Sequence, residues 1–168
     1  MSRLGHSIRN LLCFYLVFLP YVLLGDLNNG LVAWYPFDGN ASDMSGNGNH
    51  GTVYGATSEV SRHLKPSKAL NFNGINNYVK LPSTVSSSLV RDLAVSMWIN
   101  SSADSSEFLF LRIVSGNGES VKLGINQHRT IEYRINNDPF NVSVDPSVDS
   151  WFHVLCTYNG NTQKVFVD

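Results

Sequence analysis

The amino-acid sequence predicts an all-β fold in which antiparallel strands pack as a sandwich or a barrel. Two observations carry this prediction. Apolar and polar residues alternate with a period of two along several stretches, and residue pairs that tolerate positive φ separate these stretches at short intervals. No stretch beyond residue 25 keeps a helical period. One all-β domain is therefore favoured over alternating βα units.

The predicted strands are of two kinds. In the first kind every second residue is apolar, which puts one face on a core and the other on solvent, as in 93–100, 121–126 and 131–136. In the second kind apolar residues are denser and predict strands buried on both faces, as in 31–37, 108–114 and 151–158. Tight turns are predicted at Asp38-Gly39, Asn73-Gly74, Asn117-Gly118 and Asn159-Gly160. The serine-rich stretches predict loops at 83–88 and 101–106.

The first 25 residues have the features of a secretory signal peptide. Arg3 and Arg9 make a basic start, residues 11–24 are almost wholly apolar, and the small residue Gly25 follows. A membrane-spanning helix is the alternative, but it needs about 20 apolar residues, and Pro20 interrupts this run. We therefore expect a secreted or extracellular protein, with one domain at 26–168 and no membrane span in the mature chain.

Charge and cysteine content narrow the possible partners. Without Arg3 and Arg9, ten Lys and Arg face thirteen Asp and Glu, a formal charge of about −3. Nucleic-acid binding needs a clustered basic face, and we expect neither nucleic acid nor an anionic membrane as partner. With Cys13 in the leader, Cys156 is the single cysteine of the mature chain. Its apolar neighbours favour a buried thiol over a bond to another chain or to a cysteine outside this stretch.

Four blocks of sequence carry a resemblance to a known family. The first reads GLVAWYPFDGNA and runs on to DMSGNGNHG, and the second reads ALNFNGINNYV; together the blocks cover 30–51, 69–79, 93–99 and 151–168. Their order and content resemble the laminin G-like, concanavalin A-like lectin/glucanase domains. The resemblance implies a two-sheet antiparallel jelly-roll β-sandwich, with hairpins at 69–79 and 151–168. Members of the family continue past the second hairpin, so we expect the last strands of the sandwich to be missing here.

The same resemblance implies a non-catalytic module that binds carbohydrate or an extracellular protein. Related glucanases need two close carboxylates, which come from one strand carrying glutamate, aspartate and glutamate at alternating positions. No two of this chain's glutamates share a strand in that pattern: Glu59, Glu107, Glu119 and Glu132. No Gly-x-Ser-x-Gly motif and no zinc-type histidine spacing occurs either. A structural or adhesive spacer of a larger surface protein is one alternative function, and a domain related to glycoside hydrolases is a weaker one.

One loop carries candidate ligands for a calcium ion. Modules that resemble this one often hold calcium at the rim of the sandwich, so the resemblance implies calcium as a cofactor. Asp38, Asn40 and Asp43 place hard oxygen atoms close together in the sequence. The spacing is not that of an EF-hand. The alternative is that these side chains cap turns by hydrogen bonding to the backbone.

Trp98 is the candidate ligand platform. It falls on the strand face opposite Val95 and Met97, so it is either exposed to solvent or packed under a neighbouring loop. A tryptophan that belongs to the core is the alternative. Three sequons make the protein a candidate glycoprotein, at Asn40, Asn100 and Asn141.

Overall fold

The computed structural model describes residues 29–88, 92–101, 108–114, 120–126, 130–135, 138–142 and 149–168. In these ranges the chain forms β1 (Thr52–Tyr54), β2 (Thr57–Glu59), β3 (Ala69–Asn71), β4 (Tyr78–Lys80), α1 (Ser83–Ser88), β5 (Asp92–Asn100), β6 (Phe108–Val114), β7 (Ser120–Ile125), β8 (Ile131–Ile135), β9 (Asp138–Val142), β10 (Trp151–Asn159) and β11 (Gln163–Val167). The predicted signal peptide and the Asn117-Gly118 turn lie outside the described residues.

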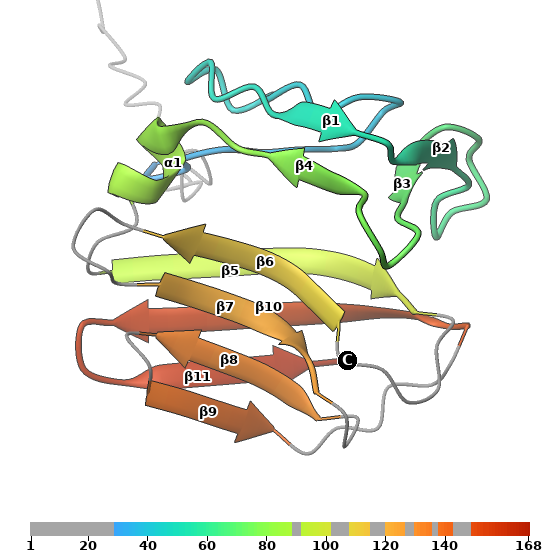
Figure 1. The fold of residues 1–168 in the computed structure, drawn as a ribbon. Coiled ribbons are helices and arrows are strands. Elements are labelled where there is room, and N and C mark those ends of the chain that lie inside the picture. Colours follow the sequence, from blue (N-terminus) through green and yellow to red (C-terminus); the bar gives the residue numbers. More distant parts are fainter. Residues whose placement is uncertain are drawn as a thin grey trace, which may run out of the picture.

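Two antiparallel sheets form the body of the domain. The strand order is β6-β7-β8-β9 in one sheet and β11-β10-β5 in the other. In Figure 1 the four-stranded sheet lies in front of the three-stranded sheet. The prediction of an all-β antiparallel sandwich is confirmed, and so is the hairpin of β10 and β11 that closes around Asn159 and Gly160.

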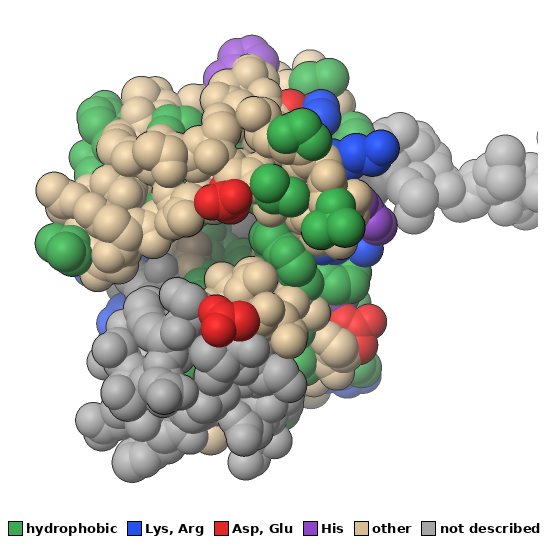
Figure 2. All heavy atoms as spheres, turned by 90° about the vertical axis from the view of Figure 1, so that its right-hand side faces the viewer, with side chains coloured by type: hydrophobic (Ala, Val, Ile, Leu, Met, Phe, Trp, Pro, Cys, Tyr) green, Lys and Arg blue, Asp and Glu red, His purple; other side chains and the backbone are tan. Residues whose placement is uncertain are grey.

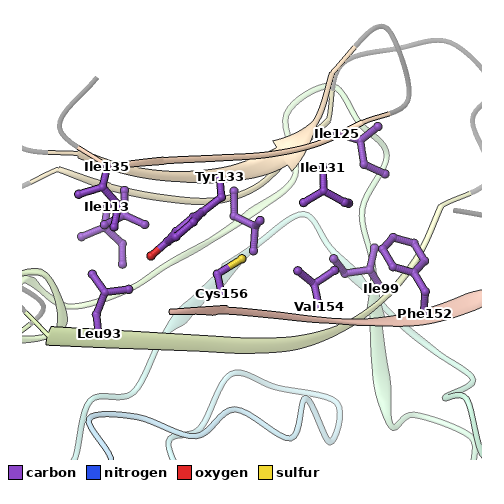
Figure 3. Packing of buried hydrophobic residues seen from close by; sticks show 12 residues of the cluster. Leu93, Ile99, Ile113, Ile125, Ile131, Tyr133, Ile135, Phe152, Val154 and Cys156 are labelled. Atoms are coloured by element: carbon purple, nitrogen blue, oxygen red, sulfur yellow. The ribbon is translucent and has the colours of Figure 1, made fainter. Parts of the chain in front are cut away.

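The core lies between these two sheets and follows from the alternation in the sequence. In β8, for example, Ile131, Tyr133 and Ile135 are buried while the residues between them are partly exposed. Figure 3 shows side chains of the two sheets pointing toward one another, with Tyr133 above and Cys156 and Val154 below. Each fully buried aliphatic side chain stabilises the fold by roughly 1.5–3 kcal/mol. The core is therefore built mainly from β5, β7, β8 and β10.

An N-terminal layer of two short strand pairs lies beside the sandwich. β1 pairs with β4 and β2 pairs with β3, both antiparallel. The predicted hairpin at 69–79 is therefore wrong, because β3 and β4 belong to different pairs. The side chain of Asn73 explains the connection, since its Oδ1 accepts the backbone N–H groups of Ile75, Asn76 and Asn77. These bonds close a local loop instead of a ladder.

Three other local predictions are wrong. The stretches 108–114 and 151–158 form β6 and β10, but these strands are not buried on both faces: Val114 is 52% exposed, and buried residues of β10 alternate with partly exposed ones. No strand forms at 31–37, because its backbone groups bond to the loop that follows: Trp34 N–H donates to Asp43, and Trp34 C=O accepts from Met44. The stretch 83–88 is the short helix α1 and not a loop. Its serine hydroxyls donate back to carbonyls one turn earlier, and Val85 is buried on its inner side. Most of the other serine-rich stretch, 101–106, lies outside the described residues.

Candidate functional site

Trp98 stands at the centre of a group of polar and aromatic side chains on the outer face of the three-stranded sheet. The register of β5 and β10 places His153 opposite Trp98. Their rings lie 5.1 Å apart with a tilt of 41°. The His153 Nε2 atom is 2.8 Å from the hydroxyl oxygen of Ser96, and its Nδ1 is 3.8 Å from a carboxylate oxygen of Asp168.

The loop between β2 and β3 supplies the fifth member of this group. The guanidinium carbon of Arg62 lies 4.0 Å from the centroid of the Trp98 ring, a cation–π geometry. Trp98 nevertheless remains 43% exposed. Both sequence alternatives for a non-core tryptophan thus hold at once, since the ring is exposed and is also contacted by a neighbouring loop. We call Arg62, Ser96, Trp98, His153 and Asp168 the Trp98 cluster.

The cluster brings together a serine, a histidine and an aspartate, and no sequence motif predicted this arrangement. A nucleophilic triad needs an imidazole oriented by a hydrogen bond to the carboxylate. The 3.8 Å separation of His153 and Asp168 is too long for that bond. Ser96 lies in the regular strand β5, without the sharp turn that exposes a nucleophile. We therefore interpret the contacts as cross-strand polar pairing that fixes the His153 ring.

Asp43, a candidate calcium ligand, is the centre of a hydrogen-bond network in the loop at 41–50. One carboxylate oxygen accepts the backbone N–H groups of Trp34 and Ser45, at 2.9 and 2.8 Å. The other accepts the Ser45 hydroxyl and the Asn49 N–H, at 2.8 and 2.9 Å. Burial opposes ionisation of Asp43, but these four hydrogen bonds outweigh it and lower the pKa to about 2.

The other two candidate ligands are also engaged within the protein. Asp38 forms a 2.6 Å ion pair with Lys68, and both side chains are about half exposed. Asn40 accepts the Ser42 N–H through its Oδ1 atom. A carboxylate offers about four lone-pair positions, and Asp43 already has four donors. This set of contacts is that of turn capping, the second of the two sequence interpretations.

The remaining sequence candidates fall in separate places. Asn40 and Asn100 are exposed, as glycosylation requires, whereas the side chain of Asn141 lies outside the described residues. Cys156 is fully buried with a free thiol, as its apolar neighbours predicted. Within the ranges given above, no three metal-ligating side chains come together. The same residues contain no helix with the length and apolar character needed to cross a bilayer.

Some members of the Trp98 cluster could have been found from the sequence and others could not. Ser96 and Trp98 are two residues apart on one strand, so a shared face was predictable. His153 joins them only through the pairing of β5 with β10, and Arg62 only through the fold of a distant loop.

Comparison with known proteins identifies the family. The model of the concanavalin A-like lectin/glucanases superfamily matches residues 73–168. No curated protein and no solved structure matches the chain. Laminin G-like domains generally bind glycans or proteins without catalysing a reaction, and they are typically extracellular. The match covers more than half of the chain and agrees with the two-sheet antiparallel fold, so this protein belongs to the concanavalin A-like lectin/glucanase superfamily.

Proposed function

We propose that this domain is a secreted, non-catalytic binding module that recognises a carbohydrate through the Trp98 cluster. The observation that carries the proposal is a half-exposed indole bordered by hydrogen-bonding side chains. A sugar ring presents an apolar face of C–H groups and an edge of hydroxyls. The exposed part of the indole, which Arg62 leaves uncovered, can contact the face, while Ser96 and His153 can exchange hydrogen bonds with the edge.

Arg62 is part of this ligand surface. Because its guanidinium lies over the Trp98 ring, a ligand that reaches the indole also meets the Arg62 N–H donors. No carboxylate among the described residues forms an ion pair with Arg62, so its donors are available to a ligand. The rigid, planar guanidinium loses little freedom when it donates to a hydroxyl or a carboxylate.

The test is a glycan-array screen followed by calorimetry on the best ligand, with wild type, Trp98→Ala and Trp34→Ala. Trp34 is 55% exposed and lies outside the cluster, so it is a matched control. Loss of an aromatic contact of about 1–1.5 kcal/mol should weaken binding by roughly tenfold in Trp98→Ala and leave Trp34→Ala unchanged. Absence of any bound glycan, or equal affinity of the two variants, would refute the proposal.

One observation favours a protein ligand as the second candidate. Phe166 on β11 is 54% exposed, and Leu155 lies beside it in register on the outer face of the same sheet. Exposed apolar side chains next to a tryptophan are typical of protein interfaces. If Phe166→Ala abolished binding to a captured protein while no glycan bound, the cluster would belong to a protein interface and an adhesive role.

Secretion rests on the basic start and apolar run of the leader. Expression in a secretory host should release a protein whose N-terminus, read by mass spectrometry, begins at Asp26. Retention of the leader in a membrane fraction would overturn this part of the proposal.

A further inference from the structure

One of the three sequons lies beside Trp98 on the outer face of the three-stranded sheet. Ile99 is 8% exposed and points into the core, so its neighbours Trp98 and Asn100 share the opposite face of β5. Asn100 is itself exposed. Two residues of a strand span roughly 6.6 Å. Asn100 is therefore the next side chain to the indole along this face.

A second tryptophan borders Asn100 on the neighbouring strand. Register places Trp151 of β10 directly opposite Asn100, just as His153 lies opposite Trp98. Side chains that face each other across an antiparallel pair have Cβ atoms about 4.5–5.5 Å apart. Trp151 is partly exposed, and the residue after it, Phe152, is buried. The asparagine thus stands between two indoles, one on its own strand and one across from it.

Asn100 is also the last residue of β5, at one end of the sandwich. The chain just beyond it is held in place, because the Asp149 N–H donates to the Ser101 C=O at 3.0 Å. In Figure 1 this end of β5 lies on the right, where β10 begins. Figure 2 looks onto that side and shows acidic and basic side chains scattered among uncharged ones. A bulky group attached to Asn100 can extend from this end without entering the core.

We propose that Asn100 carries an N-linked glycan whose first sugar packs on the exposed part of the Trp98 indole. The acceptor motif is Asn100-Ser101-Ser102, of which Ser102 lies outside the described residues. The donor is an oligosaccharide linked to a lipid diphosphate. The bond between C1 of its first sugar and the diphosphate oxygen breaks, and a bond from C1 to the Asn100 Nδ2 atom forms. The lipid diphosphate and one Nδ2 proton are released.

The packing follows from the chemistry of this first sugar, an N-acetylglucosamine. One face of its ring carries C–H groups, which suit contact with a flat, apolar indole. Attachment to Asn100 keeps the sugar beside Trp98 at an effective concentration in about the millimolar range. The contact therefore costs less entropy than the capture of a free sugar does. The chain's own glycan is thus an occupant for the part of the indole that Arg62 leaves uncovered.

The inference rests on the secretion proposed above but not on the binding of an external sugar. An external glycan and the Asn100 glycan would need the same indole and would compete for it. An external glycan should therefore bind Ser102→Ala, which lacks the sequon, more tightly than it binds glycosylated wild type. Equal affinities would overturn the packing. Absence of any external ligand would overturn only the carbohydrate site, because the two experiments that follow do not use one.

The first experiment expresses the full chain in a mammalian secretory host and maps its glycans by mass spectrometry of peptides. We expect the leader to be removed and Asn100 to be glycosylated. A chain without its leader but with an unmodified Asn100 would overturn the inference and leave secretion standing. A chain that retains its leader and has an unmodified Asn100 would overturn both.

The second experiment measures whether the glycan and Trp98 stabilise the fold together. Each shift in melting temperature is taken relative to the same pair of proteins made in bacteria, where no glycan is attached. Ser102→Ala should melt roughly 2–4 °C below wild type, and the same change in a Trp98→Ala background should have no effect. Trp98→Phe keeps a flat ring and should keep part of the shift. Equal shifts in the wild-type and Trp98→Ala backgrounds would overturn the packing.

The sequon at Asn40 provides the matched control. It lies in the N-terminal loop, where the Asn40 Oδ1 atom accepts the Ser42 N–H. Ser42→Ala removes this sequon and keeps both Asn40 and the backbone N–H that bonds to it. Its shift should be the same with and without Trp98. A Trp98-dependent shift as large as that of Ser102→Ala would show that the effect is not specific to Asn100 and would overturn the inference.

Discussion

Replacing Asp43 with Asn tests whether this carboxylate holds the N-terminal loop by itself. The substitution keeps the shape of the side chain but turns one acceptor oxygen into an amide donor. If the amide nitrogen takes the position of the oxygen that now binds Asn49, the Asn49 N–H will face another donor at a site where Asn49 is only 8% exposed. The Ser45 hydroxyl can rotate and accept instead, so one donor is left unpaired.

The magnitude follows from these contacts. One buried unpaired N–H costs about 1–3 kcal/mol, and the bonds from Trp34 and Ser45 lose the strengthening that a charged acceptor gives them. We expect Asp43→Asn to lower the free energy of unfolding by roughly 2–4 kcal/mol. Asp38→Asn is the matched control, because its half-exposed ion pair with Lys68 is worth only about 0–1 kcal/mol.

The assay is urea unfolding of both variants, with calcium and then with a chelator. A loss for Asp43→Asn that is the same in both conditions is expected, together with faster hydrogen exchange at Trp34 and Asn49. Equal effects of the two substitutions would refute the reasoning. A loss that appears only when calcium is present would show that Asp43 is a metal ligand, as the first sequence interpretation had it.

The dependence of stability on acidic pH provides a second test of the role of Asp43. The pKa of Asp43 is lowered from 3.8 to about 2 in the folded state. Its contribution to stability is therefore complete above pH 4 and is lost as the pH falls through about 2. Asp43→Asn should be less stable than wild type at pH 5 and should approach it at pH 2. A constant difference across this range would contradict the assigned pKa.

Three further predictions concern the core and one close contact. Tyr133→Phe should raise the free energy of unfolding by about 1 kcal/mol in urea, because the buried hydroxyl has no hydrogen-bond partner among the described residues; a clear loss would reveal a partner. Burial raises the pKa of Cys156 from 9.0 to about 12, so the unfolded thiol ionises first and stability should fall from pH 9 to 12, less steeply in Cys156→Ala. Gly51→Ala should lower the melting temperature, since a new Cβ would lie 2.8 Å from a Val79 methyl carbon; an unchanged melt would show that Val79 can move aside.

The parts of the fold that follow from local chemistry were predictable. Alternation located β5, β7 and β8, and Gly39, Gly74 and Gly160 take the positive φ that their turn positions required. The apolar residues at 31–37 wrongly predicted a strand. The backbone groups of this stretch bond to the Asp43 carboxylate and to the Met44 N–H of the following loop instead of to a neighbouring strand. Composition does not say where backbone groups find their partners.

The Trp98 cluster depends on pairing between strands that are distant in sequence. His153 reaches Trp98 only because β10 lies beside β5. Register decides which face a side chain of β6 lies on as well, because a bulge between Leu109 and Leu111 shifts it. A slip of one residue would turn Arg112 into the core, so alternation alone does not predict this placement.

The contact between Arg62 and Trp98 joins two parts of the molecule that share no ladder hydrogen bonds within the described ranges. The strand pairs β1-β4 and β2-β3 form sheets of their own, apart from the two large sheets. Regions of this kind can open without global unfolding. A ligand that binds Arg62 and Trp98 together stabilises the state in which these two residues are in contact, because it binds that state only. Such a ligand would hold the N-terminal strand pairs against the three-stranded sheet. Opening of these strand pairs and unfolding of the two large sheets would then occur in one cooperative step when the site is filled.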